Sequence, residues 1–279
     1  MAVPDEPNDG RGKPGREPAV EASLKSVRVL VTRPAHQADA LVRLIEAAGG
    51  EAVRLPTIEI VAPVDPAPLN AVLDRLHEFN WAIFLSPNAV RQALPLMRAR
   101  GMPPTMRLAA VGLGTQQALR AEGFDQVLAP SERFDSEALL ELLPPAAVTG
   151  QNILLVRGVG GRELLNEQLK ARGAHLSYAE CYRRVPPRQL NPVALARLQQ
   201  GEIDIVSITS VEGLRNLYNL TGNTSRARLL ATPVLVVSER QAQACRDLEF
   251  HAAVQVAARA SDAAIVDALH AWRATRNSI

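Results

Sequence analysis

The sequence predicts an α/β fold: two doubly wound parallel-sheet domains, related by internal duplication and joined by extended linker segments. Three observations support this prediction. The chain has 279 residues, enough for two domains of roughly 100–200 residues each. Hydrophobic residues make up 47% of it and charged residues 22%, which is typical of a globular protein and excludes collagen and wholesale disorder. Short apolar runs alternate with segments of helix periodicity, and this alternation occurs twice.

The repetition is visible in three pairs of segments. Each pair shares an order of apolar run, turn and amphipathic helix, and the offset between partners stays near about 125 residues. The second pair places Ser86 opposite Ser210. The pairs are 27–58 with 152–183, 80–94 with 204–218, and 107–124 with 233–250. We therefore interpret the chain as two copies of one unit.

Six apolar runs are predicted as strands, and because they are continuous they fit strands buried on both faces of a parallel sheet. They are Val27–Thr32, Trp81–Leu85, Leu108–Val111, Asn152–Val156, Ile203–Ile208 and Val234–Val237. Each precedes a predicted helix. The helices are Ala38–Ala48, Ala89–Arg100, Thr115–Glu122, Glu163–Arg172, Val211–Leu220 and Gln241–Leu248. Strands that alternate with helices predict parallel pairing through right-handed crossovers.

Two proline-rich stretches, Arg54–Pro68 and Tyr182–Pro192, are predicted as connectors. Each follows the second apolar run of a matched block and has β-prone residues before its prolines. We expect both to be extended segments that join the domains.

Candidate binding residues follow the predicted strands, because ligands of doubly wound sheets bind at the carboxyl ends of the strands. The sequence places hydroxyls, glycines and arginines there. Together with the unsatisfied N–H groups of helix N-termini, such residues hold anions, so we expect a ligand with carboxylates or phosphates. The candidates are Arg33, Ser86, Asn88, Thr115, Arg157, Gly158, Thr209, Ser210 and Arg240.

Arginine and tyrosine have distinct expected roles. Arg33, Arg157 and Arg240 suit bidentate capture of carboxylates, with ion pairs at the surface or between domains as the alternative. Tyr182 lies where a strand enters a connector. It is a candidate acid or hydrogen-bond donor, and the alternative is a tyrosine that packs the hinge.

Several other chemistries are disfavoured by the strand-end residues. They contain no nucleophile–base pair, no paired carboxylates and no cluster of histidine or cysteine, so we predict no metal site. The segments VGLGTQQ (111–117) and RGVGGRE (157–163) lack the full dinucleotide fingerprint, and no phosphate-binding P-loop occurs. A nucleotide-dependent transferase is therefore a weak alternative.

Charge and the remaining composition limit partners and location. A net charge of +2 and an aromatic fraction of 4% argue against a nucleic-acid partner. No apolar run reaches the ~18 residues that span a bilayer, so no membrane partner is expected. Residues 1–25 are predicted to be a disordered leader, rich in proline, glycine and charge. With two isolated cysteines expected to be reduced, we predict a cytoplasmic protein, and nothing indicates more than a monomer.

Eight segments in order resemble the bacterial uroporphyrinogen-III synthase family, and they extend over about residues 27–270. They are VLVTRPAHQADAL (29–41), IFLSPNAV (83–90), AAVGLGTQQAL (109–119), FDSEALLELL (134–143), LLVRGVGGRELLNEQLKARGA (154–174), ECYRR (180–184), ITSVEGL (208–214) and VVSERQA (236–242). No single segment is unique, but the ordered set is specific.

The resemblance implies a cyclising hydro-lyase of tetrapyrrole (heme) biosynthesis that acts without a metal or an organic cofactor. Its substrate would be hydroxymethylbilane, a linear tetrapyrrole rich in carboxylates, and its product uroporphyrinogen III, in which ring D is inverted. The family fold implies a discontinuous domain of residues 26–53 plus 188–279 and a second domain of residues 64–178. A two-stranded linker, residues 54–63 and 179–187, would join them, with the active site in the cleft between the domains.

The resemblance also assigns residues. Tyr182 matches the family tyrosine that assists loss of the hydroxyl, and Thr115 matches a family threonine. Ser86 and Ser210 match hydroxyls at equivalent strand ends. Where some members carry two threonines, this chain has Arg240–Gln241, so Arg240 is expected to bind a carboxylate instead. The alternative function is a two-lobed binding or regulatory protein that holds an anionic small molecule without catalysis.

Overall fold

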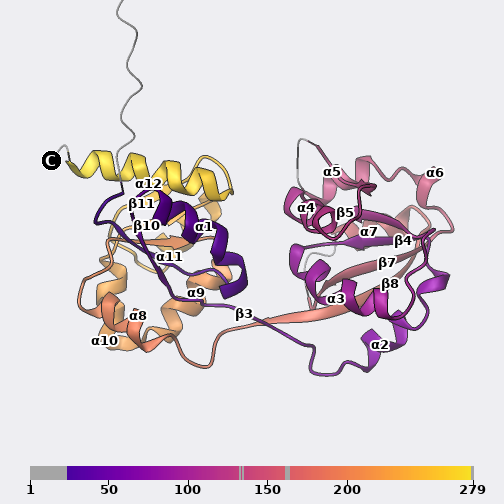
Figure 1. Ribbon diagram of the computed structural model, residues 1–279, viewed down its shortest axis with the longest axis horizontal. Coiled ribbons are helices and arrows are strands. Elements are labelled where there is room, and N and C mark those ends of the chain that lie inside the picture. The colour runs from indigo at the N-terminus through magenta and orange to yellow at the C-terminus, as the bar shows by residue number, and fades with distance from the viewer. Residues whose placement is uncertain (1–23, 132, 134, 161–163, 278–279) are drawn as a thin grey trace, which may run out of the picture.

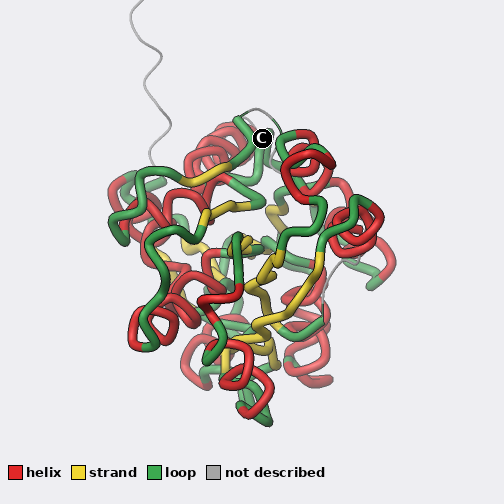
Figure 2. The backbone as a smooth tube through the Cα atoms, turned by 90° about the vertical axis from the view of Figure 1, so that its right-hand side faces the viewer, coloured by secondary structure: helices red, strands yellow, loops and turns green. Residues whose placement is uncertain are grey.

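Two lobes, each built around a parallel β-sheet, lie side by side and are joined by two extended segments (Figure 1). The computed structural model describes residues 24–131, 133, 135–160 and 164–277. We call the lobe with the five-stranded sheet the terminal lobe, because it contains the carboxyl end of the chain, and the other the inserted lobe. Viewed along the long axis, helices surround the strands (Figure 2).

The terminal lobe combines segments from both ends of the chain. Its amino-terminal elements are β1 (Arg28–Val31), α1 (Ala35–Ala47) and β2 (Glu51–Arg54). Its carboxyl-terminal elements are α8 (Pro192–Gln199), β9 (Ile205–Ile208), α9 (Val211–Leu220), α10 (Gly222–Leu230), β10 (Val234–Val236), α11 (Glu239–Asp247), β11 (Val254–Val256) and α12 (Asp262–Asn277).

The inserted lobe is formed by the intervening chain. Its elements are β3 (Glu59–Val61), α2 (Ala67–Leu73), the 3₁₀-helix η1 (Leu76–Glu78), β4 (Trp81–Phe84), α3 (Pro87–Ala99), β5 (Arg107–Ala110), α4 (Leu113–Ala121), β6 (Val127–Leu128), α5 (Ser136–Glu141), α6 (Pro145–Val148), β7 (Asn152–Gly158), α7 (Leu164–Ala171) and β8 (His175–Val185).

The two sheets have corresponding strand orders. The terminal sheet runs β11-β10-β9-β1-β2, and the inserted sheet runs β6-β5-β4-β7-β8 with β3 at its edge. All pairs are parallel except β3 with β8, which are antiparallel. Each segment pair of the sequence repeat therefore occupies matching places in the two sheets. The chain therefore has an α/β fold with two sheets, both mostly parallel.

Each sheet is buried on both faces, which explains why its strands are continuous apolar runs. In β4, Ala82 and Phe84 pack into a cluster that includes residues of α3, whereas Trp81 and Ile83 pack into a second cluster with α5 and α7. In β1, Leu30 and Val31 likewise belong to different clusters. Because helices cover the two faces of each sheet, a ligand can approach the strands at their carboxyl ends.

The six predicted strands and six predicted helices are confirmed, with ends that shift by about three residues at most. The predicted start of one helix at Glu163 lies outside the described residues, and so do residues 1–23 of the predicted leader. Leu24 is fully buried and its N–H donates to the Ala48 carbonyl at 2.9 Å. The packed chain thus includes the end of the segment predicted as leader.

The connector predictions are partly wrong, because both proline-rich stretches end in helices. Helix α2 starts at Ala67, with Pro66 before it, and α8 starts at Pro192. Asn191 caps α8, since its Oδ1 accepts from the N–H groups of Val193 and Ala194. Proline at the first helical position initiates a helix as readily as it extends a linker. The extended part is the pairing of β3 with the end of β8.

No described helix combines the length and hydropathy needed to span a membrane.

Candidate functional site

A cavity of about 490 Å³ lies at the carboxyl ends of β4, β5 and β7 in the inserted lobe. We call it the cleft cavity, because α9 of the terminal lobe contributes Glu212 to its lining. Parallel sheets bind ligands at this edge. The lining residues are Leu85, Ser86, Val111, Ser136, Arg157, Gly158, Val159, Gly160, Leu165, Tyr182, Arg183, Arg184 and Glu212.

Tyr182 and Ser86 form a hydrogen-bonded pair in this cavity. The Tyr182 Oη and the Ser86 Oγ are 3.0 Å apart, although 96 residues separate them in the chain. Ser86 is the N-cap of α3, and its Oγ also accepts from the Ala89 N–H at 3.1 Å. The capping hydrogen bond orients the Ser86 hydroxyl, and that hydroxyl in turn orients the Tyr182 phenol.

Positive charge predominates around the pair. Three arginines and one glutamate line the cleft cavity. Arg183 on β8 donates from Nε to the Ala62 carbonyl at 3.1 Å, and Arg184 lies 3.8 Å from the Glu212 carboxylate. The Arg184 side chain is half exposed. This distribution favours an anionic ligand.

Arg157 is almost fully buried beside the cavity. Its Nε donates to the Gly160 carbonyl at 3.0 Å and lies 3.9 Å from a Glu180 carboxylate oxygen. A buried guanidinium needs such partners. Arg157 therefore holds the turn after β7 in place, next to Gly158.

Two residues of α1 reach from the terminal lobe to α3 of the inserted lobe. The Asn88 Oδ1 lies 2.9 Å from the His36 Nε2 and accepts from the Gln37 Nε2 at 2.8 Å. Asn88 is 5% exposed. We call these three side chains the cross-lobe bridge, since they connect the strand-end regions of the two sheets.

The structure brings four of the ten predicted site residues into the cleft cavity: Ser86, Arg157, Gly158 and Tyr182. Asn88 is in the cross-lobe bridge. Thr115 is buried in the first turn of α4, and Arg240 is exposed in the first turn of α11.

The other predicted residues lie on the terminal lobe, outside the cleft cavity. Thr209 and Ser210 lie between β9 and α9, and the Ser210 Oγ caps α9 by accepting from the Gly213 N–H at 2.9 Å. Arg33 forms an ion pair with Asp262 of α12, which is the alternative that the sequence left open for it.

Sequence reasoning missed Arg183, Arg184, Ser136 and Glu212 of the cleft cavity, and His36 and Gln37 of the bridge. The arginines are part of the ECYRR segment, so their place beside Tyr182 was a usable signal. The histidine carried no signal, because only the arrangement of the lobes brings it to Asn88.

Burial keeps the thiol beside Tyr182 neutral. Cys181 is 3% exposed, and burial raises its pKa to about 12. The Sγ–H donates to the Arg157 carbonyl at 3.3 Å. The thiol therefore serves as a donor in the strand pairing. Among the described residues, no group of three histidine, cysteine, aspartate or glutamate side chains is placed to hold a metal ion.

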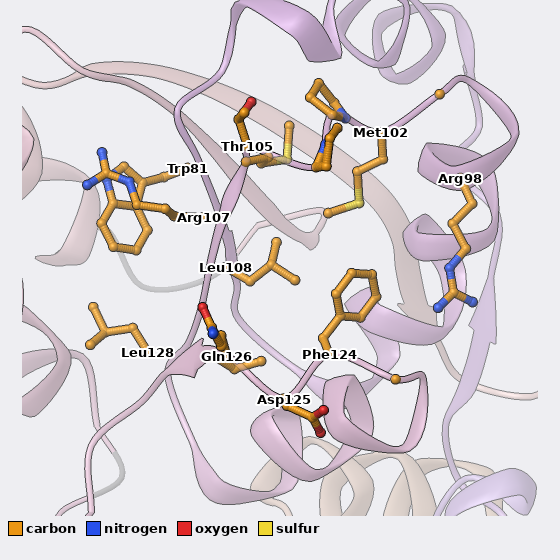
Figure 3. A pocket seen from close by; sticks show the side chains of 16 residues that line it. Trp81, Arg98, Met102, Thr105, Arg107, Leu108, Phe124, Asp125, Gln126 and Leu128 are labelled. Atoms are coloured by element: carbon orange, nitrogen blue, oxygen red, sulfur yellow. The ribbon is translucent and has the colours of Figure 1, made fainter.

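A larger cavity of about 1030 Å³, the edge cavity, lies around the opposite ends of β4 and β5 (Figure 3). Arg107 stacks on Trp81 there at 4.2 Å, and Arg98 lies 5.3 Å from the Phe124 ring. Both guanidinium groups also bond to protein oxygens, of Gln151 and Glu122. Among the described residues, none of the helices that directly follow a strand begins at the edge cavity. Such helix starts provide the N–H groups that bind anions, so we place the site in the smaller cleft cavity.

Comparison with known proteins identifies the family of this chain. Residues 39–267 match the protein family described as Uroporphyrinogen-III synthase HemD. A uroporphyrinogen-III synthase of Salmonella typhimurium is 37% identical over 245 residues, which cover 86% of this chain and 99% of that protein. The Escherichia coli protein of the same name is 34% identical, with the same coverage.

A solved structure shares the fold. The crystal structure of a mutant uroporphyrinogen III synthase from Thermus thermophilus aligns with a TM-score of 0.56 and 19% identity. The alignment covers 91% of this chain and all of that one. The extent of the family match and the identity to curated relatives establish the family: this chain belongs to the uroporphyrinogen-III synthases.

Proposed function

We propose that this protein catalyses the cyclising dehydration of hydroxymethylbilane to uroporphyrinogen III, a step of tetrapyrrole biosynthesis, and does so in the cleft cavity. Membership of the family supports the reaction. The hydrogen-bonded pair of Tyr182 and Ser86, in a cavity with three arginines, is the observation that supports the location. The resemblance noted in the sequence supplies the chemistry that these groups would perform.

Substrate binding is the first task of the site. Hydroxymethylbilane carries carboxylates on all four pyrrole rings, and guanidinium groups and helix N-termini bind carboxylates. Arg183 and Arg184 face the cavity and are the proposed primary ligands. The remaining predicted contacts would bind the rest of the extended substrate. They are Thr115, Thr209, Ser210 and Arg240, whereas Arg33, Asn88 and Gly158 have structural contacts within the protein.

Loss of water from ring A is the second task. In the proposed step, the Tyr182 hydroxyl donates its proton to the departing hydroxyl group. The C–O bond breaks, water leaves and the tetrapyrrole remains as an azafulvenium cation. Ser86 is placed to donate a hydrogen bond to the phenolate that forms. A later proton loss from the cyclised product returns the proton to Tyr182, so the enzyme is unchanged at the end.

Control of the product isomer is the third task. Ring D attacks the cation through its substituted carbon, and the resulting spiro intermediate opens and closes again with ring D inverted. The free cation closes without inversion in water, so the protein must select a conformer by position. Two lobes connected by the cross-lobe bridge provide opposed surfaces for this selection.

The same proposal includes the organisation of the chain. We propose that duplication of one doubly wound unit produced the two lobes, because the five parallel strands of each sheet have corresponding orders. Residues 26–53 plus 188–279 and residues 64–178 would be the domains, with a two-stranded linker at 54–63 and 179–187. The proposed enzyme is a cytoplasmic monomer, and its two buried free cysteines support a reducing compartment.

A coupled assay with freshly made hydroxymethylbilane tests the function. The proposal predicts isomer III well above the isomer I that forms spontaneously. An isomer I background that the protein leaves unchanged would contradict the proposal. If the polyanion then bound without turnover, the binding-protein alternative would be favoured.

A further inference from the structure

The strand that carries Tyr182 contains a β-bulge at the residue before it. Arg157 of β7 pairs with Glu180 of β8, but the next residue, Gly158, pairs with Tyr182. Cys181 is thus an extra residue in β8. A bulge of this kind redirects the side chains that follow it.

The bulge changes the face on which Tyr182 lies. Successive side chains of a regular strand point to opposite faces of the sheet. Here Ala179, Cys181 and Tyr182 are all buried in the same cluster, on the face that α3 covers. If β8 continued in regular pairing through Cys181, Tyr182 would point to the opposite face, away from Ser86 at the start of α3.

Gly158 then provides the surface on which the tyrosine ring rests. A Cβ at position 158 would lie 2.6 Å from the Tyr182 Cζ and 2.7 Å from its Cε2. Real Cβ atoms do not approach that closely, so any larger residue would displace the ring. Close approach, and not backbone conformation, is what requires glycine at this position.

Hydrogen bonds on both sides keep the bulge in place. The Cys181 Sγ–H donates to the Arg157 carbonyl at 3.3 Å, and the Val159 N–H donates to the Tyr182 carbonyl at 2.7 Å. The strand pairing is therefore satisfied immediately before and after the aromatic residue. At the far end of the ring, the hydroxyl meets the Ser86 Oγ.

We propose that Gly158 and the bulge residue Cys181 are positioning residues, which hold the Tyr182 hydroxyl against Ser86 at the point where the substrate loses its hydroxyl. This inference rests on the proposed function, because that function assigns proton donation to Tyr182. Neither residue contacts the reacting atoms in this proposal; each acts through the orientation of the phenol.

The test is a double-mutant cycle with Gly158→Ala and Tyr182→Phe, measured as kcat and KM for isomer III. Gly158→Ala is expected to lower kcat roughly 10- to 100-fold, because a small displacement of an acid is costly, with KM nearly unchanged. In the Tyr182→Phe background it should change kcat less than about twofold, since the hydroxyl to be positioned is gone. An equal loss in both backgrounds would show a merely structural role and overturn the inference.

A cysteine pair keeps the inference testable if Gly158→Ala does not fold. Cys181→Ala should lower kcat about threefold, a smaller effect because only one bulge hydrogen bond is lost. The matched control is Cys245→Ala, which removes an equally buried free thiol from the terminal lobe and should leave kcat unchanged. Equal effects of the two substitutions would contradict the inference.

The outcomes separate this inference from the proposed function. Absence of isomer III from the wild-type reaction overturns the function. Activity in the wild type that Tyr182→Phe leaves intact overturns the role of Tyr182 and the positioning inference, while the reaction itself stands. A slow Tyr182→Phe variant together with a fully active Gly158→Ala variant overturns the positioning inference alone.

Discussion

The terminal and inserted lobes place corresponding serines after corresponding strands, but the inserted lobe has a tyrosine, Tyr182, where the terminal lobe has Thr57. In the sequence repeat, Thr57 occupies the position of Tyr182, and Ser210 that of Ser86. Both serines cap the helix that follows their strand. The strand orders around them correspond as well. The comparison thus contrasts Tyr182 and its surroundings with the matching region of a largely shared framework.

The hydrogen bonds of the two positions differ. Thr57 is fully buried, and its Oγ1 donates to the Thr32 carbonyl at 3.2 Å. Its own carbonyl accepts from the Asn216 Nδ2 at 2.9 Å. The Tyr182 hydroxyl instead meets another side-chain hydroxyl in a cavity. The threonine hydroxyl bonds within the terminal lobe, whereas the buried tyrosine lines the cavity in which we propose that the substrate binds.

This difference indicates how two lobes of similar fold can differ in the reactive side chain that they carry. The framework supplies helix N-termini and hydroxyls in both lobes, which suffices to bind anions. In the inserted lobe, a bulge at Cys181 and the close approach of Gly158 place the phenol that we propose as the acid beside Ser86. We therefore expect substitutions in the two lobes to separate catalysis from stability.

The largest expected effect comes from substituting the equivalent positions. Tyr182→Phe should lower kcat roughly 100-fold, the scale of a lost general acid, without abolishing isomer III, because the cleft still selects the conformer. Thr57→Val should leave kcat unchanged and lower the free energy of unfolding by about 1 kcal/mol, the scale of one hydrogen bond. Steady-state kinetics and urea unfolding measure the two effects. A kcat loss in Thr57→Val comparable to that in Tyr182→Phe would remove the proposed asymmetry.

A smaller effect is expected from the cavity charges. Arg184→Gln should raise KM about tenfold with little change in kcat, because a charge-assisted hydrogen bond to a carboxylate contributes about 1.5–3 kcal/mol. The control is Arg75→Gln, an exposed arginine next to Glu78 and outside both cavities. If both substitutions raised KM equally, general charge attraction and not the cleft cavity would explain binding.

The cross-lobe bridge should matter less. Asn88→Ala removes two hydrogen bonds between the lobes and is expected to raise KM about fivefold, equivalent to about 1 kcal/mol. The radius of gyration from small-angle X-ray scattering should increase. Asn216→Ala, which removes a bond within the terminal lobe, is the control. An unchanged KM and radius in Asn88→Ala would show that the bridge does not hold the lobes together.

The smallest effect concerns pH. Burial raises the pKa of Cys181 to about 12 and that of Cys245 to about 11, from 9.0. The folded protein therefore binds more protons than the unfolded chain above about pH 9. Stability from this source is intact below pH 9 and falls as the pH rises toward the folded pKa values. Urea unfolding between pH 8 and 10.5 should show the decline, and a Cys181→Ala/Cys245→Ala double variant should reduce it. An identical decline in the double variant would contradict this assignment.

The sequence was sufficient for features encoded in short segments. Apolar runs such as Trp81–Phe84 predicted strands because burial on both faces leaves no polar alternation. Tyr182 could be identified as a candidate because it ends such a run. The bulge at Cys181 could not be predicted, since register depends on the partner strand.

Contacts distant in sequence were likewise beyond reach. The pairing of Arg33 with Asp262 requires the position of α12, and that of His36 with Asn88 requires the arrangement of the lobes. The helix at Ala67 was obscured by prolines that could equally begin a helix or extend a linker. Local patterns therefore predicted the framework and selected Tyr182 as a candidate, but not the groups that contact its ring.

The most direct test of the central claim is a crystal structure with uroporphyrinogen III bound. We predict that the macrocycle lies between the lobes, with the Tyr182 hydroxyl facing the carbon that joins rings A and D and with carboxylates on Arg183 or Arg184. A product molecule seated in the edge cavity, between Trp81 and Phe124, with the cleft cavity empty, would contradict the account.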